Sequence, residues 1–380
     1  MNCFGIDALS GVAVEIEFDE TIREVRPARE TPGVYLAPGW IDIQVNGFAG
    51  VDFNCPDVEH GEIARAVRRQ IADGVTRLYP TVITGAPDDM RKALCNLSRA
   101  KDSIAEGAAI DGFHVEGPHI GSEDGPRGAH PKRWVRKPDF DEYRSWQDAT
   151  DGRVRIVTIS PEWPEAPAYM ERVVADGVVA SIGHTGANAQ QIADAVSAGA
   201  SLSTHLGNGA HAVMRRHPNY IWDQLAEDRL MADFIVDGIH VGDAFLKTAV
   251  RAKGVERSVL VTDASAPAGA KPGRYYLGEQ PVDLTEDDRV VLAGTEKLAG
   301  SALHMHRAII NVMRMAGVSL ADAVRMATVN AAAAGNVPGR KLGLAPGERA
   351  DVVQFTIEAN QLQIQAVWIG GVQQAIPQAC

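Results

Sequence analysis

Three side chains of the kind that bind a catalytic metal ion stand at the ends of short apolar runs. They are Glu116 in GFHVEG, His184 in SIGHT and His205 in STHLG. Two imidazoles and a carboxylate, with one position left for water, are the ligands of a catalytic zinc-like ion. Such an ion lowers the pKa of water toward neutrality. The three residues therefore predict a hydrolytic metal site.

A further carboxylate, Asp263 in LVTDASAPAG, also ends an apolar run. A lone Asp beside Ser and Pro is more often a turn or helix-capping residue. Together with the two histidines, Asp263 is better explained as the acid/base that takes a proton from water and passes it to a leaving group. His240, in DGIHV, stands in a comparable place after another run.

The elements that would position these side chains alternate between strands and helices. Stretches 60–74 and 188–200 have apolar residues three and four apart and stop at or near Gly, as helices do. The predicted strands are Trp40–Val45, Arg77–Val82, Ile110–Glu116, Val154–Ile159, Val178–Gly183, Ala200–His205, Met231–Val236 and Ser258–Asp263.

Eight strands alternating with helices predict an α/β protein with a (β/α)₈ TIM-like barrel. A doubly wound open sheet is the alternative, but no Gly-x-Gly-x-x-Gly turn follows the first strand. The chemistry of such a barrel lies at the C-terminal ends of its strands. The candidate residues all fall at such ends, so we expect them on one rim.

The two ends of the chain do not follow this alternation. VAVEIEF near the start, and DVVQFTI and QAVWIGG near the end, read as strands. We expect residues 1–38 and 343–380 to form one small accessory β domain, with residues 39–342 as the barrel. The segment 275–298 also looks β-rich and is followed by helices through Ala334.

Composition narrows the possible partners. The chain of 380 residues has a net charge of −12 and no basic run, which argues against nucleic acid or an anionic membrane as partner. Cys3, Cys55, Cys95 and Cys380 are scattered, so no disulfide framework is expected. With no apolar stretch long enough to span a bilayer and no signal-like start, we expect a cytoplasmic protein.

The remaining histidines carry weaker signals. His130, in GAHP, could hydrogen-bond substrate hydroxyls, whereas His119, His211 and His217 are interpreted as bystanders. His304 and His306 are two residues apart in a predicted helix, which would place them on different faces and suits shared metal binding poorly.

The ordered motifs resemble those of the N-acetylglucosamine-6-phosphate deacetylases, a family of the amidohydrolase superfamily. They are PGWIDIQVNGFAGVDFN, GFHVEGPHI, GAHP, SIGHT, THLGNG, DGIHV, LVTDASAPAG and LAGSAL. The resemblance runs from about residue 38 to residue 340. It implies metal-dependent hydrolysis of the acetamido group of an N-acetyl amino sugar, a small-molecule substrate, by a homodimer.

The resemblance also implies roles for single residues. Glu116, His184 and His205 match metal ligands, Asp263 the acid/base and His240 a residue that assists at the substrate carbonyl. The positions that match substrate contacts are His130, Asn208, Gly209, Arg216 and His240, with Arg216 as the phosphate partner.

The first strand bears on the number of metal ions. Many amidohydrolases have His-x-His there, and this chain has Gln44 and Asn46 instead. These residues look like the remnant of a second metal site, so one divalent ion per chain is expected. Zinc suits the ligand set best, and iron, manganese or cobalt would also be accepted.

Two departures from the family pattern lie beside the expected sugar and phosphate contacts. Asn208-Gly209-Ala210 stands where Asn-Ala-Met is usual, and Arg216-His217-Pro218 where Arg-Glu-Pro is frequent. An amidohydrolase acting on another N-acetyl sugar or on an N-acyl amino acid thus stays open. A non-catalytic sugar-binding barrel is the alternative from another class, and the presence of Asp263 argues against it.

Overall fold

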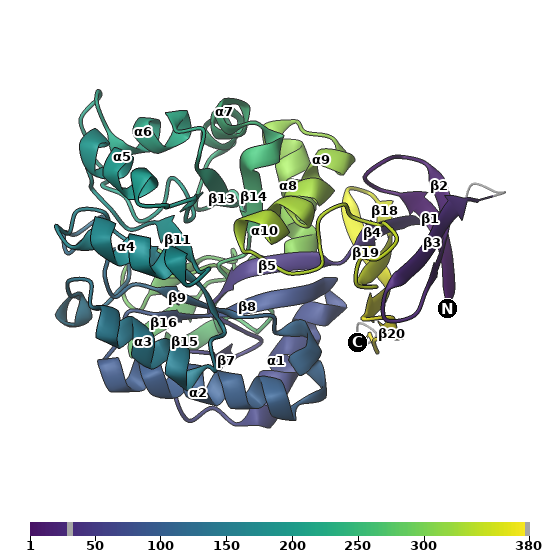
Figure 1. The fold of residues 1–380 in the computed structure, drawn as a ribbon, viewed down its shortest axis with the longest axis horizontal. Coiled ribbons are helices and arrows are strands. Elements are labelled where there is room, and N and C mark those ends of the chain that lie inside the picture. Colours follow the sequence, from purple (N-terminus) through teal and green to yellow (C-terminus); the bar gives the residue numbers. More distant parts are fainter. Residues whose placement is uncertain (29–32, 377–380) are drawn as a thin grey trace.

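The structure is a computed structural model that describes residues 1–28 and 33–376. A barrel of parallel strands surrounded by helices forms its larger part, and a small β domain lies at one side (Figure 1). The barrel sheet has the order β14-β13-β12-β11-β10-β9-β8-β5. Its strands are β5 (Trp40–Val45), β8 (Val75–Ile83), β9 (Phe113–Glu116), β10 (Val154–Ile159), β11 (Val179–Ile182), β12 (Leu202–Ser203), β13 (Met231–Ile235) and β14 (Ser258–Val261).

The predicted (β/α)₈ barrel is confirmed. Every neighbouring pair in the sheet is parallel, and the bridge between Val45 and Ala264 brings the two outer strands together. Each of the eight predicted strands corresponds to an observed one. The largest differences are β9, which starts at Phe113 rather than Ile110, and β12, which is only two residues long.

One or more helices follow each barrel strand and cover its outer face. They are α1 (His60–Ala72), α2 (Pro87–Ser103), α3 (Phe140–Ala149), α4 (Ala166–Ala175), α5 (Ala189–Ser197), α6 (Tyr220–Ala226), α7 (Asp243–Lys253), α8 (Met305–Ala316), α9 (Leu320–Met326) and α10 (Val329–Ala334). Their apolar faces pack on the strands in one continuous core. Local sequence fixes the starts of some of them: in α5, Asn188 and Gln191 form a reciprocal capping box.

The start of α8 corrects one expectation. The helix begins at Met305, and His304 lies at its N-cap with extended backbone angles. His304 and His306 are therefore not two helical residues on different faces, and the prediction that they point apart is wrong. Both imidazoles turn toward Asp73.

The small β domain combines both ends of the chain, as predicted. Its seven-stranded sheet has the order β20-β19-β18-β4-β1-β2-β3, so the first and the last strand of the chain both belong to it (Figure 1). The strands are β1 (Asn2–Asp7), β2 (Ala13–Phe18), β3 (Ile22–Pro27), β4 (Tyr35–Pro38), β18 (Val352–Glu358), β19 (Gln361–Ile369) and β20 (Val372–Gln373). In the middle, β4 pairs in parallel with β1 and antiparallel with β18. The division of the chain into these two domains at residues 38 and 342 remains a proposal.

A buried ionic network joins the small domain to the barrel. The Nε of Arg77, on β8, donates to Asp351 Oδ2 over 2.6 Å, and Arg340 donates to the Asp351 carbonyl over 3.1 Å. All three side chains are buried. Because an unpaired charge would be costly there, the network favours one arrangement of the two parts.

Two short additional sheets lie outside the barrel. Strands β6 (Gly47–Phe48) and β7 (Val51–Asp52) pair after β5, and β15 (Gly273–Leu277), β16 (Gln280–Leu284) and β17 (Val290–Leu292) form an antiparallel sheet after β14. The second of these confirms the β-rich character predicted for residues 275–298. No helix among the described residues is long and apolar enough to cross a membrane. Cys3, Cys55 and Cys95 are free thiols, and Cys380 lies outside the described residues.

Candidate metal centre and active site

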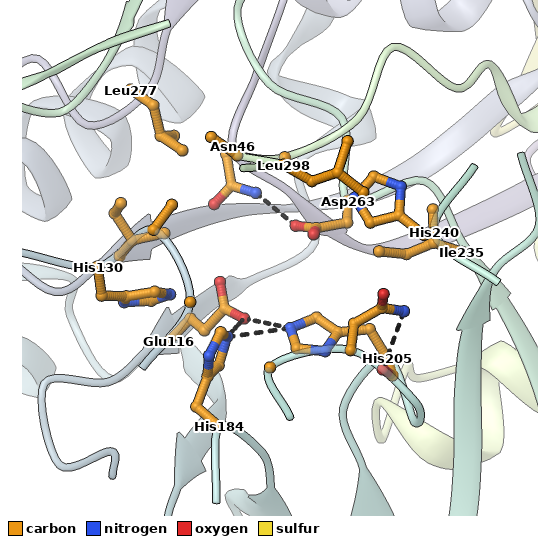
Figure 2. Close-up of a pocket in the computed structure, with 17 residues that line it drawn as sticks. Asn46, Glu116, His130, His184, His205, Ile235, His240, Asp263, Leu277 and Leu298 are labelled. Carbon is orange, nitrogen blue, oxygen red and sulfur yellow. Dashed lines mark hydrogen bonds and ion pairs between the residues drawn. The ribbon is translucent and has the colours of Figure 1, made fainter. Parts of the chain in front are cut away.

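A cavity opens at the C-terminal rim of the barrel and holds most of the predicted site residues (Figure 2). It contains about 590 Å³ of free space, part of it open to solvent. Strand ends and the β15–β17 segment both contribute to its wall. The lining residues are Asn46, Ile83, Glu116, Gly128, Ala129, His130, His184, His205, Asn208, Gly209, Ile235, His240, Asp263, Leu277, Leu298, Ala299 and Gly300.

The three predicted metal ligands converge on one point of this cavity. Glu116 Oε1 lies 3.0 Å from His184 Nε2 and 2.8 Å from His205 Nε2, and the two nitrogens are 3.1 Å apart. Metal–nitrogen bonds of about 2.0–2.1 Å at tetrahedral angles place ligand atoms about 3.3 Å apart. The spacing of the three atoms is thus close to that of a ligand set around one ion.

The electrostatics of the group also fit a cation. His184 Nδ1 donates to the Pro126 carbonyl over 2.8 Å, which leaves its Nε2 lone pair facing the cavity. Burial alone would raise the pKa of Glu116, but the adjacent imidazoles of His184 and His205 hold that pKa well below its usual range. The carboxylate is therefore ionised, and a divalent ion at this point would meet one negative charge and imidazole lone pairs.

A second combination of ligand atoms exists in the same place. Glu116, His130 and His184 also offer ligand atoms within 4.8 Å of one another. The Nδ1 of His130 is hydrogen-bonded to Thr84 Oγ1 over 2.8 Å, whereas His205 Nε2 directly faces both Glu116 and His184. The shorter distances favour the set with His205 and leave His130 as a neighbour of the site.

The backbone is unusual at three of the candidate residues. His184, His205 and Asp263 have φ angles of 51°, 29° and 47°, in the left-handed region that residues other than glycine rarely adopt. Each lies two residues after the last residue of a barrel strand. Left-handed backbone at non-glycine residues is concentrated at functional sites, where it aims a side chain at a cost in stability. Here it turns the three side chains into the cavity.

Asp263 faces the metal-ligand group across the cavity (Figure 2). Its Oδ1 accepts hydrogen bonds from Asn46 Nδ2 at 2.6 Å and from Gln44 Nε2 at 3.2 Å, and Gln44 Nε2 also lies 2.9 Å from Glu116 Oε1. Burial, followed by repulsion from Glu116, raises the pKa of Asp263 to about 8. Two buried carboxylates that accept hydrogen bonds from the same amide nitrogen favour a cation or a proton between them.

His240 is oriented by a residue that the sequence did not single out. Its Nδ1 lies 2.6 Å from Asp237 Oδ2, and Asp237 Oδ1 accepts the backbone N–H of His240 over 2.8 Å. The pKa of Asp237, which burial would raise, is lowered by the hydrogen bond from His240. An Nδ1–H that donates to this carboxylate leaves Nε2 to act in the cavity. In the sequence, only the spacing of three residues between Asp237 and His240 could have indicated that these two side chains pair.

A buried carboxylate behind His205 was also missed. The backbone N–H of His205 donates to Asp233 Oδ1 over 2.5 Å. His205 Nδ1 and Asp233 Oδ2 are both buried without a hydrogen-bond partner among the described residues. Asp233 lies within β13, where an acidic residue on a buried strand is the only hint that the sequence offers.

The predicted substrate contacts are brought together only in part. His130, Asn208 and Gly209 line the cavity, but Arg216 does not and is exposed on the loop before α6. His119, His211 and His217 are also absent from the lining. The sequence analysis did not predict that Leu277 and Leu298–Gly300 line the cavity. It considered only residues at the ends of barrel strands, and these residues belong to the inserted segment after β14.

Comparison with known proteins gives a consistent result. Residues 35–373 match the amidohydrolase family. The human N-acetylglucosamine-6-phosphate deacetylase is 34% identical over 365 residues, which cover 93% of this chain and 87% of the human one. The Bacillus subtilis enzyme of the same name is 33% identical over 321 residues, covering 84% and 80%.

Among solved structures, a mutant of N-acetyl-D-glucosamine-6-phosphate deacetylase from Mycobacterium smegmatis, in complex with N-acetyl-D-glucosamine-6-phosphate, is similar over almost the whole chain. The TM-score is 0.89 at 31% identity, with 99% of each chain covered. The similarity therefore includes both the barrel and the small β domain.

Proposed function

This chain belongs to the N-acetylglucosamine-6-phosphate deacetylase family of amidohydrolases, and we propose that its rim cavity hydrolyses the acetamido group of N-acetylglucosamine 6-phosphate, releasing acetate and the free amino sugar. The observation that carries the proposal is the convergence of Glu116, His184 and His205 opposite Asp263. Metal ligands and a buried carboxylate on opposite sides of one cavity suit attack of water on an amide carbonyl.

The proposal includes one divalent metal ion per chain in the rim cavity, with Glu116, His184 and His205 as its protein ligands. When bound, such an ion supplies Lewis acidity, which polarises an amide carbonyl and makes water a better nucleophile near pH 7. Two nitrogens and one oxygen suit zinc first and iron, manganese or cobalt next. Gln44 and Asn46 support a single ion, because their amide groups already hydrogen-bond the two carboxylates that a second ion would need.

The protein's own residues then move the protons. A cation held beside Glu116 would oppose the burial and repulsion that raise the pKa of Asp263. The ionised Asp263 then accepts a proton from the attacking water and delivers it to the amide nitrogen, which leaves as an amine. His240, held through Nδ1 by Asp237, presents Nε2 toward the carbonyl oxygen of the substrate, where negative charge develops. Asn46 and Gln44 keep the Asp263 carboxylate aimed at the reacting atoms.

Substrate binding is assigned to the cavity wall and to the loop before α6. His130, Asn208 and Gly209 are proposed to contact the sugar. Arg216 is exposed on this loop, and we propose that it binds the phosphate through charge-assisted hydrogen bonds.

An acetate-release assay over matched substrates tests this assignment. We expect turnover of N-acetylglucosamine 6-phosphate, and weaker turnover of unphosphorylated N-acetylglucosamine, of the galactosamine and mannosamine counterparts and of N-acetyl amino acids. In the variant Arg216→Ala, KM for the phosphorylated sugar should rise about 10- to 100-fold with little change in kcat, because a charged hydrogen bond is lost.

The neighbouring Arg215→Ala serves as the control, since it removes the same charge from the same exposed loop. If the unaltered protein hydrolysed N-acetylglucosamine and its 6-phosphate at equal rates, Arg216 would not be the residue that binds the phosphate. Such equal rates would favour a deacetylase for another N-acetyl sugar, while turnover of N-acetyl amino acids alone would contradict the amino-sugar assignment.

We further predict that the protein is a homodimer and that it is located in the cytoplasm. The loop and helix beside the cavity expose Val213, Met214 and Trp222, which are 90%, 37% and 47% exposed. Exposed apolar side chains on this segment support coverage by a second copy of the chain. Sedimentation equilibrium that returned the mass of one chain would contradict the homodimer.

A further inference from the structure

A second group of metal-ligating side chains lies apart from the rim cavity. It consists of Asp73, directly after α1, and of His304 and His306 at the start of α8. Each residue is partly buried, and each offers a ligand atom within 4.8 Å of the others. None of the three lines the rim cavity. The proposed deacetylation makes no use of them.

The two imidazoles approach opposite oxygens of one carboxylate. His304 Nδ1 lies 2.6 Å from Asp73 Oδ2, and His306 Nδ1 lies 3.3 Å from Asp73 Oδ1. The ring of His304 is fixed from its other side by Phe48, at 5.0 Å between ring centroids and nearly perpendicular. The ligand atoms are therefore held on two elements that are far apart in sequence.

Hydrogen bonding alone does not satisfy this group. His306 Nδ1 is buried and has no partner with hydrogen-bond geometry among the described residues, although the Asp73 carboxylate lies beside it. Burial would raise the pKa of Asp73, but the hydrogen bond from His304 and the nearby imidazole of His306 lower it, so this carboxylate is ionised at neutral pH. An ionised carboxylate and two neighbouring imidazoles, one of them unpartnered, are a donor set for a transition metal.

We propose that Asp73, His304 and His306 form a second binding site for a divalent transition-metal ion of the zinc class, which fastens the end of α1 to the beginning of α8. Two nitrogens and one oxygen give three protein ligands, and water completes the coordination. The partial exposure of His306, whose side chain is 25% exposed, gives the ion a path from solvent. The site is structural, because no cavity that could take a substrate adjoins it among those described.

The zinc content of four proteins tests the proposal. The purified full chain, His306→Gln, His184→Asn and the double variant are dialysed to equilibrium against excess zinc, and zinc per chain is measured by mass spectrometry. We expect about two ions in the unaltered chain, about one in each single variant and about none in the double variant. Removing the more exposed imidazole limits the risk of misfolding, and Asp73→Asn provides a second variant of the same site.

A matched control is His60→Gln. His60 also lies at a helix start and hydrogen-bonds to Ser103 and Asn96, but it belongs to neither metal-ligating group. This variant should keep about two ions. The kcat/KM for deacetylation of His306→Gln should stay within about twofold of the unaltered chain, because none of the three residues of this site lines the rim cavity.

A stability measurement gives an independent readout. In the His184→Asn background, zinc at about a hundredfold excess over its Kd should raise Tm by about 3 °C, and the further change His306→Gln should remove that rise. Equal zinc content in the unaltered chain and His306→Gln, or an unchanged Tm in the His184→Asn background, would overturn the proposal. Neither outcome would affect the proposed deacetylation, which rests on other residues.

Discussion

Replacing Asp263 by Asn is expected to lower kcat for acetate release by at least about 1,000-fold while the metal ion stays bound. The side chain keeps its size and its Oδ1 acceptor for Asn46 and Gln44, but it can no longer take up a proton. A loss of that size corresponds to about 4 kcal/mol of transition-state stabilisation. KM should change little, because the substrate contacts are made by other residues.

Metal content and steady-state kinetics of the same preparation check this result. Asp42→Asn is a matched control, since Asp42 is also a buried barrel carboxylate whose pKa burial raises, here to about 7. It hydrogen-bonds Thr262 and does not line the cavity. We expect it to retain kcat within about tenfold. If Asp263→Asn kept full turnover, Asp263 would not be the acid/base. If the variant lost the metal ion from the rim cavity, Asp263 would instead be a ligand of that ion.

The second large effect is expected from the metal ligands themselves. In the rim cavity, His184→Asn and His205→Asn should each hold well below one ion per chain, because each loses a nitrogen whose distance to Glu116 is 3.0 Å or less. Their kcat should fall by at least about 1,000-fold, since the ion supplies the Lewis acid of the reaction. Addition of excess zinc or cobalt should restore little activity.

Metal content of single variants also distinguishes the two possible sets of metal ligands in the cavity. If Glu116, His130 and His184 held the ion, His130→Asn would lose it and His205→Asn would keep it. We expect the reverse, because His130 is hydrogen-bonded to Thr84 and His205 faces both other ligands. His211→Asn is the control for a histidine near the cavity: it contacts Tyr220 and Glu123, and should retain both metal and activity.

Much of the barrel was predictable because its signals are local. Buried parallel strands are short apolar runs, and amphipathic helices ending at Gly separate them, so β5 and β10 match their predicted limits. The placement of Glu116, His184, His205 and Asp263 followed from the same pattern, since strand ends of a barrel share one rim. What the sequence could not supply is the left-handed backbone that turns three of these side chains inward.

The remaining features depend on contacts between distant segments. The cavity wall formed by Leu277 and Leu298 comes from an inserted sheet whose docking has no sequence signature. The position of Arg216 depends on the course of a long loop, and motif matching says nothing about that course. His304 is predicted to lie on the same helix as His306, whereas that helix starts one residue after His304. Helix limits are the least reliable part of such reasoning.

The central position of β4 has a consequence for the order in which the protein can assemble. β4 is made early, but its partner β18 belongs to the last tenth of the chain and is translated after the whole barrel. During synthesis the edge of β4 that later pairs with β18 has no native partner, and a free strand edge invites association with other chains. The closing of the small sheet therefore marks the end of folding, and a nascent chain stalled before residue 352 would carry an open edge on an otherwise formed barrel.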